Sequence, residues 1–182
     1  GLIPPIDDSN PVSPQRSPYW LTLPDFVRLF ATSVDRCDVL AGYLAHRGEL
    51  HRIGLIDGFQ WLNGSFSENI ELIEGRSPRD VDVVTYCRQG DAFFDALEPD
   101  ALKVVDDHDW IKASYKVDFY IQSLSDAPEV LVQVSAYWYS MWSHRRSKQW
   151  KGFIAVDLAP DDDAEASQAL EDRREELEHE QE

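Results

Sequence analysis

Cysteine is scarce in this chain of 182 residues, which contains only Cys37 and Cys87. They lie far apart, and neither belongs to a CxxC or Cys/His pair, so the sequence favours neither a disulfide framework nor a zinc site. No apolar run approaches the roughly 18 to 20 residues of a membrane span. The start of the chain lacks the basic and apolar regions of a signal peptide. We therefore expect a cytoplasmic protein without a membrane partner.

Basic residues are also few, with 17 Lys and Arg against 34 Asp and Glu and a net charge of −17. This balance excludes a generally basic surface for duplex nucleic acid, so any phosphate-binding group must be local. The 43% of hydrophobic residues, including 12% aromatic ones, suffices to build the core of one ordinary domain at this length.

Composition divides the chain into three parts. Residues 1–18 contain five prolines, which fix φ and remove backbone donors, so we expect an extended arm there. Residues 159–182 hold 11 acidic residues and two arginines. Such a segment buries too little apolar area to offset its ordering entropy, so we expect a solvated acidic tail that can be helical. Residues 19–158 then form the domain.

Apolar spacing in the domain predicts an α/β (α+β) fold with a mixed sheet flanked by helices. The expected helices span 24–30, a segment from a cap at Thr32 or Ser33 to 50, two short pieces within 89–112, and 129–147. The expected strands span 59–62, 80–86, 115–121 and 152–158.

Three aspartates carry the chemistry that this pattern suggests. Asp80 and Asp82 alternate with valines, which places both carboxylates on one face of a strand, and Asp118 lies on a later strand. Carboxylates that converge repel one another unless cations neutralise them. Their hard oxygens suit Mg²⁺ or Mn²⁺, and a pair of such ions can promote phosphoryl or nucleotidyl transfer. We therefore predict that these three aspartates are catalytic and bind metal.

Together with Gly64-Ser65, which follows an earlier strand, the aspartates resemble the signature of the DNA polymerase β-like nucleotidyltransferase superfamily. The chain also resembles a small bacterial nucleotidyltransferase-like family whose function is not assigned. That resemblance rests on segments 58–66, 79–84 and 136–152, and it covers about residues 2–158.

The resemblance implies a minimal nucleotidyltransferase fold. In it, Gly64-Ser65 begins a helix and holds the β- and γ-phosphates of a nucleoside triphosphate. Asp80 and Asp82 bind both metal ions, and Asp118 binds the catalytic one and can accept the proton of the acceptor. The stretch between Ser65 and Asp80 is longer than usual for the superfamily, so we expect an inserted loop at 70–78. The residues of segment 67–79 themselves indicate a polar loop or a short helix and loop.

The densest basic cluster consists of Arg145, Arg146, Lys148 and Lys151. Guanidinium groups suit bidentate phosphate contacts, so Arg145, Arg146 and Lys151 are predicted to bind the triphosphate beside Gly64 and Ser65. The alternative is that the cluster only complements the dipole at a helix C-terminus.

Each candidate has a simpler interpretation. Asp80 and Asp82 could be solvated acids of an edge strand, and Ser65 could cap the next helix, which is compatible with phosphate binding. Asp118 competes with Asp106, Asp107 and Asp109 for the third position. Glu68 could be an ordinary exposed acid or could orient a ligand. The aromatic residues Tyr137, Trp138 and Trp142 fit a core better than base stacking.

The resemblance implies an enzyme that moves a nucleoside monophosphate from a triphosphate such as ATP to a hydroxyl acceptor. It suggests a protein acceptor first, as in toxin–antitoxin or phage-defence systems, with a tRNA 3′ end as the other option. One alternative is an inactive nucleotidyltransferase-like partner, an antitoxin or regulatory module whose acidic tail masks a basic surface. Another is a metal-dependent phosphohydrolase.

Overall fold

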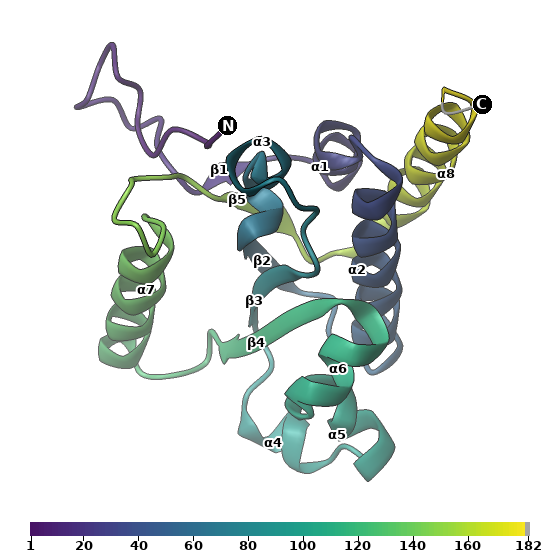
Figure 1. The fold of residues 1–182 in the computed structure, drawn as a ribbon. Helices are drawn as coiled ribbons and strands as arrows, with labels where there is room; N and C mark the ends of the chain where they lie inside the picture. The colour runs from purple at the N-terminus through teal and green to yellow at the C-terminus, as the bar shows by residue number, and fades with distance from the viewer. Residues whose placement is uncertain (181–182) are drawn as a thin grey trace.

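A five-stranded mixed sheet organises the computed structural model, which describes residues 1–180 (Figure 1). The strands are β1 (Tyr19–Trp20), β2 (Gly58–Asn63), β3 (Val81–Cys87), β4 (Val117–Ser123) and β5 (Ile154–Asp157). Their order is β1-β5-β2-β3-β4. Strand β2 is antiparallel to β3 and β5, whereas β3 and β4 run parallel. Strand β4 is an edge strand because it comes last in the order.

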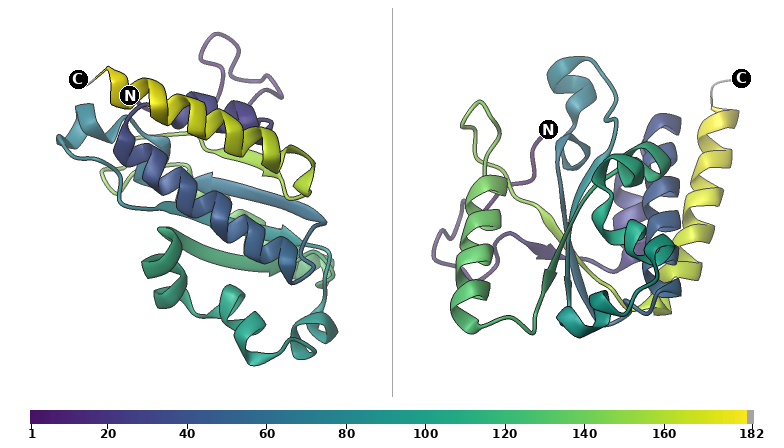
Figure 2. Two further views of the ribbon diagram at one scale, coloured as in Figure 1. Left: turned by 90° about the vertical axis from the view of Figure 1, so that its right-hand side faces the viewer. Right: turned by 90° about the horizontal axis from the view of Figure 1, so that it is seen from below.

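Helices cover both faces of the sheet, which makes the fold mixed α/β (Figure 2). The helices of the described residues are α1 (Leu23–Phe30), α2 (Val34–Arg52), α3 (Ile70–Glu74), α4 (Asp91–Asp95), α5 (Pro99–Asp106), α6 (His108–Tyr115), α7 (Pro128–Trp142) and α8 (Asp163–His179). Helix α7 lies alone on one face, and α1, α2, α6 and α8 lie on the other. No helix within residues 1–180 has both the length and the apolar character needed to cross a bilayer.

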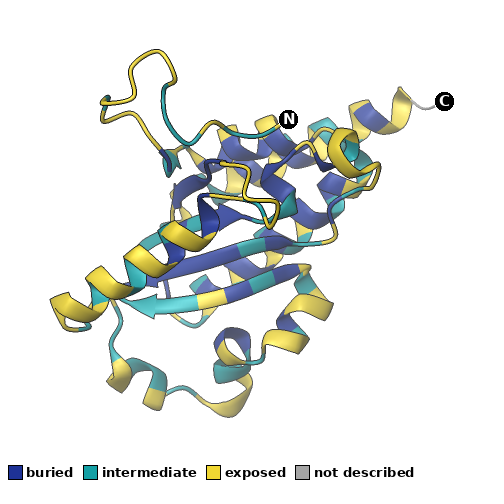
Figure 3. Ribbon diagram, turned by 60° about the vertical axis from the view of Figure 1, so that its left-hand side comes forward, coloured by how far each residue is buried: buried dark blue, intermediate teal, exposed yellow. Residues whose placement is uncertain are grey.

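Alternation along β3 separates two hydrophobic cores. Val81 and Val83 face the larger core with α1, α2 and α8. Val84 and Tyr86 face a smaller core that α7 completes with Trp138, among others. The central strands are consequently buried along most of their length, and the helices turn exposed faces outward (Figure 3).

Helix starts follow the caps that the sequence offers. Thr22 Oγ1 accepts a hydrogen bond from Asp25 N (3.2 Å) at α1, and Ser33 Oγ accepts one from Arg36 N (3.3 Å) at α2. Of the two predicted caps for the second helix, Ser33 is the one used. Helix α7 ends at Trp142 and not at 147, because the chain turns back there and residues 144 and 150 form a β-bridge.

The acidic C-terminal segment differs from the solvated tail expected for 159–182. Helix α8 packs against α1 and α2, and it buries Ala166, Leu170 and Leu177. These residues recur at helical spacing and form one apolar stripe. Average composition concealed this stripe, because the charges occupy the other faces of the helix.

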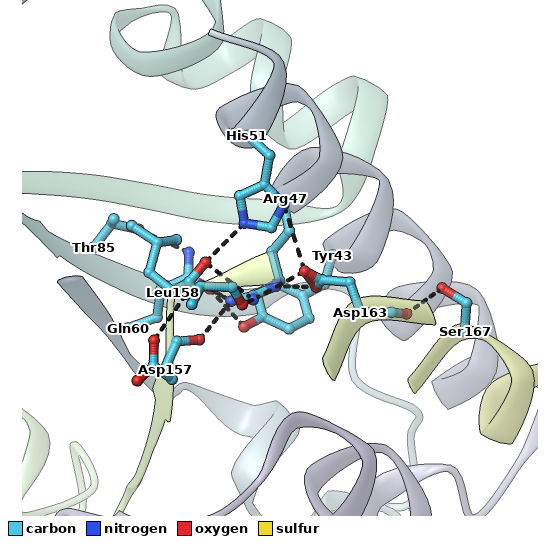
Figure 4. Close-up of polar contacts among 10 residues, drawn as sticks. Tyr43, Arg47, His51, Gln60, Thr85, Asp157, Leu158, Asp163 and Ser167 are labelled. Atoms are coloured by element: carbon cyan, nitrogen blue, oxygen red, sulfur yellow. Dashed lines mark hydrogen bonds and ion pairs between the residues drawn. The ribbon is translucent and has the colours of Figure 1, made fainter. Parts of the chain in front are cut away.

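A buried arginine ties α8 to the domain (Figure 4). The Arg47 side chain of α2 is fully buried. Its Nε donates to Asp163 Oδ1 at the start of α8 (2.8 Å), and its Nη1 donates to Gln60 Oε1 on β2 (2.7 Å). Tyr43 Oη also donates to Gln60 Oε1 (2.7 Å). The guanidinium therefore links α2, β2 and α8.

Residues 1–18, the expected arm, lie against the domain through backbone contacts. Ile3 O accepts a hydrogen bond from Gly152 N (2.7 Å), and Gly1 O accepts one from Asn69 N (2.7 Å). An isolated bridge also joins Leu2 to Glu68, whereas the bridge between Ile6 and Arg16 lies within the arm itself.

Candidate functional site

Asp82 and Asp118 lie side by side on the parallel strands β3 and β4. Each is the second residue of its strand, and the two are register partners. They line a cleft of about 710 Å³ beside α7, together with Gly64 at the end of β2. Asp80 lies just before β3. The pairing of two adjacent parallel strands is thus what brings distant carboxylates together.

Burial gives Asp82 unusual electrostatics. It raises the pKa of Asp82 to about 6, with further increases from the negative charges of Asp118 and Asp80. The ammonium groups of Lys151 and Lys112 act in the opposite direction. A carboxylate in this state gains stability from any cation that approaches it.

Lys112, on the last turn of α6, already supplies one such cation. Its Nζ lies 2.8 Å from Asp80 Oδ2 and 2.9 Å from Asp118 Oδ2. The hydrogen bond to Asp80 is the largest cause that raises the pKa of Lys112, and the hydrogen bond to Asp118 raises it further. Burial of the ammonium opposes this increase and lowers the pKa by less. Nothing in the sequence pattern indicated this residue, because its contact depends on how α6 leads into β4.

The donor chemistry of the three aspartates suits a hard divalent cation. Within residues 1–180, no three Asp, Glu, His or Cys side chains are grouped closely enough to hold a metal ion. The ammonium of Lys112 stands between two of the carboxylates instead. The oxygen ligands therefore fit Mg²⁺ or Mn²⁺ in kind, whereas in this arrangement two of the carboxylates contact the ammonium of Lys112.

Gly64 allows the Asp82 carboxylate to approach the backbone. Its φ is 81°, and a Cβ at this position would lie 2.8 Å from both Asp82 Cγ and Oδ1. Ser65 follows at the start of a helix, as the resemblance implied, but this helix is a single 3₁₀ turn, Ser65–Ser67. The five-residue α3 comes only after this turn, within the segment 70–78 that was expected to be an inserted loop.

Two residues that sequence reasoning missed fix this turn. Ser67 Oγ donates to Asn63 Oδ1 (2.8 Å), and Asn63 Nδ2 donates to the carbonyl oxygen of Trp142 at the end of α7 (3.2 Å). Both side chains are buried, so the turn after β2 is tied to the opposite wall of the cleft.

Two of the predicted phosphate-binding residues have acidic partners. The buried Lys151 donates from Nζ to Glu68 Oε1 (2.6 Å) and to the carbonyl oxygen of Gly64 (2.9 Å). Burial lowers the pKa of Lys151, although Glu68 partly offsets this. Arg145 forms ion pairs with Glu68 Oε2 (2.8 Å) and Glu74 Oε1 (2.7 Å).

Glu68 is therefore a buried counter-ion and not an exposed acid. Arg145, Arg146 and Lys151 nonetheless all line the cleft, as do Gly64 and Ser65. Arg76 adds a further guanidinium to the cleft, and it lies outside the basic cluster that the sequence indicated. Arg145, Arg146 and Lys151 lie beyond the end of α7, in the segment between α7 and β5, whereas Arg76 lies between α3 and β3.

The aromatic residues of α7 divide between the core and the surface. Trp138 and Trp142 are buried in the smaller core, as their spacing predicted, whereas Tyr137 is 57% exposed. Trp138 and Tyr120 of β4 line both the cleft and a neighbouring hollow of about 600 Å³. The hollow therefore adjoins the carboxylates on the edge-strand side.

The competing acids do not join Asp82. Asp107 caps α6 by accepting a hydrogen bond from Trp110 N (3.0 Å), and Asp106 lines the neighbouring hollow. Asp109 lies exposed on α6. Among the candidates for the third acid, Asp118 is the one that the sheet register pairs with Asp82.

Fold and site together define a mixed α/β protein with a carboxylate-lined cleft at the ends of two parallel strands. A family model described as a family of unknown function (DUF6932) matches residues 1–157, and the chain belongs to that family. No curated protein and no solved structure matches the chain. The matched region contains the whole sheet and the cleft, and it ends before α8.

Proposed function

We propose that this chain is a metal-dependent nucleotidyltransferase. The observation that carries the proposal is the register pairing of Asp82 and Asp118 opposite Gly64. Two carboxylates on adjacent strands, a backbone approach open only to glycine, and a cleft with cations at its other end suit a phosphorylated substrate. In this proposal the sheet and its flanking helices form the minimal nucleotidyltransferase fold that the sequence resemblance implies.

Each group of residues has a separate task in the proposed reaction. Asp80, Asp82 and Asp118 would hold Mg²⁺ or Mn²⁺, which would neutralise negative charge at the transferred α-phosphoryl group. Asp118 also accepts the proton of the acceptor hydroxyl, whose oxygen bonds to the α-phosphorus as the bond to the β-phosphate breaks and pyrophosphate leaves.

The other end of the cleft binds the triphosphate. Arg145 and Arg146 neutralise its charge, and Gly64 and Ser65 hold it at the turn. Lys151 contributes by fixing the carbonyl of Gly64, which sets the shape of that turn. Electrostatic positioning of this kind can supply most of the rate enhancement without covalent chemistry from the protein.

We propose a hydroxyl group of a protein as the acceptor, with a toxin–antitoxin or phage-defence role in the cytoplasm. The net charge of −17 disfavours unaided binding of a polynucleotide. A tRNA 3′ end is the competing acceptor, and the experiment below distinguishes the two.

The test is incubation of the full chain with Mg²⁺ and each α-³²P-labelled nucleoside triphosphate, alone and with cell lysate. We expect label on a protein band that protease removes and ribonuclease does not. The Asp82→Asn variant should lose the transfer, and Asp109→Asn, an exposed acid of α6, should retain it. Label on an RNA band would show that the acceptor is RNA and not protein, and the proposed enzyme class would stand.

Two outcomes would overturn the enzyme class. Release of inorganic phosphate without label transfer would indicate a phosphohydrolase. Absence of any turnover with a folded chain would support the alternative of a non-catalytic binding module.

A further inference from the structure

We propose that the ammonium of Lys112 takes one of the two cation positions among the carboxylates, so that the site binds one divalent cation. This inference rests on the proposed function, because it concerns the cation content of the same site. It differs from the pair of ions that the sequence resemblance implied.

Backbone geometry holds Lys112 over the two strands. Lys116 has a φ of 56°, in the left-handed region, and its N donates to Lys112 O (3.0 Å). The chain therefore leaves α6 and enters β4 at Val117 with no intervening loop. The last turn of α6 consequently stays beside the start of β4, where Lys112 reaches both Asp80 and Asp118.

Charge balance favours one divalent ion. When ionised, the three aspartates carry three negative charges, and Lys112 neutralises one of them. The remaining charge equals that of a single divalent cation. Of the other cations that line the cleft, Lys151, Arg145 and Arg76 pair with Glu68 or Glu74. Among the ion pairs of the described residues, Lys112 is the cation that contacts the aspartates.

A second divalent ion would have to displace the ammonium from both carboxylates. Two charge-assisted contacts, of 2.8 and 2.9 Å, would then be lost. If the ammonium stayed, the second ion would experience repulsion both from it and from the first ion. Asp82, which has no direct contact with Lys112 among the ion pairs of the described residues, remains to anchor the single ion.

The experiment is a titration of the metal-free full chain with Mn²⁺, with free Mn²⁺ measured by electron paramagnetic resonance. We expect one bound ion in the wild type. Lys112→Met should bind two, with the first held about tenfold more tightly because a like charge has been removed. Lys103→Met, which removes a half-exposed lysine of α5, should bind one ion as the wild type does.

The Lys112 side chain is 47% exposed, so its replacement should leave the fold intact, and circular dichroism checks this. Lys112→Arg keeps the charge and should retain one ion, which provides a second variant. Two ions in the wild type, or one ion in both wild type and Lys112→Met, would overturn the inference but leave the proposed function standing. No bound Mn²⁺ in either chain would overturn the proposed function itself.

Discussion

Gly64 and Asp82 are packed so closely that the backbone of one residue forms a wall for the carboxylate of the other. A Cβ at position 64 would lie 2.8 Å from Asp82 Cγ and from Oδ1, and 3.0 Å from Oδ2. The glycine of the Gly-Ser pair thus has a steric role towards the acid, besides any role towards a phosphate. The conformation of residue 64 and the position of Asp82 should therefore be coupled in experiments.

Replacing Gly64 by alanine should impair the site more than the fold. The φ of 81° with a ψ of −164° lies in a region that only glycine adopts readily, so it costs about 1 to 3 kcal/mol for a residue with a Cβ, and the clash displaces the Asp82 carboxylate. Because a shift of about 1 Å can reduce a reaction rate about 100-fold, we expect label transfer to fall at least about tenfold.

Gly75→Ala is the matched control, because Gly75 has a φ of 66° and nothing within 4 Å of its Cβ position. It should carry the cost of the left-handed helical region, about 1 to 2 kcal/mol, and keep the transfer. Equal transfer by the two variants would contradict the coupling of Gly64 to Asp82.

The contribution of Asp82 to the stability of the metal-free chain should fall as pH rises from about 4 to 6. The native state keeps a proton on Asp82 up to its pKa of about 6, whereas the unfolded chain releases it near the ordinary value of 3.8. Above pH 6 the wild type therefore carries a cost of about 2 to 3 kcal/mol. Asp82→Asn removes this cost, so urea unfolding should show the variant more stable than the wild type at pH 7.5.

The difference between Asp82→Asn and the wild type should vanish near pH 4, where both side chains are neutral. Mg²⁺ at pH 7.5 should stabilise the wild type and not the variant. A stability difference that stayed constant across this pH range would show that Asp82 does not cause it.

Glu68 and Lys151 should behave as a coupled buried pair. Glu68→Gln leaves the buried ammonium of Lys151 without its carboxylate, so we expect a loss of about 3 to 5 kcal/mol in the free energy of unfolding. The double variant Glu68→Gln/Lys151→Met should lose clearly less than the sum of the single losses. Urea unfolding of the four chains measures the coupling, and simple additivity would argue against it.

Asp163→Ala should destabilise the whole domain and not only the end of the chain. Arg47 is fully buried and would keep only neutral acceptors, such as Gln60 and backbone carbonyls. We expect a loss of about 3 kcal/mol in the free energy of unfolding, measured in urea. Asp161→Ala, an exposed acid two residues earlier, should change stability by less than about 0.5 kcal/mol.

The sequence predicted the elements whose patterns are local. Alternation of valines with acids indicated the strand that became β3, and the cap at Ser33 marked the start of α2. Strand β4 starts two residues later than expected, because α6 continues to Tyr115 and Lys116 makes the turn. The mixed α/β class followed from these segments.

The contacts that the sequence could not predict depend on the register between distant segments. Lys112 meets Asp80 only because α6 ends directly at β4, and Glu68 is buried only because Lys151 returns from beyond α7. No local pattern encodes either distance. The helical spacing of the apolar residues in α8 indicates a buried stripe, whereas the net charge of the same segment indicates a solvated one. The structure follows the spacing.

The contact between Arg47 and Asp163 crosses the boundary of the family match, which ends at residue 157. Arg47 lies inside the matched region, whereas the carboxylate that it binds, that of Asp163, lies outside it. A relative whose chain stops before this helix must therefore supply another anion or an uncharged residue at position 47. The two positions should accordingly be inherited or lost as a unit, and their joint presence would identify relatives in which the C-terminal helix is an integral part of the domain.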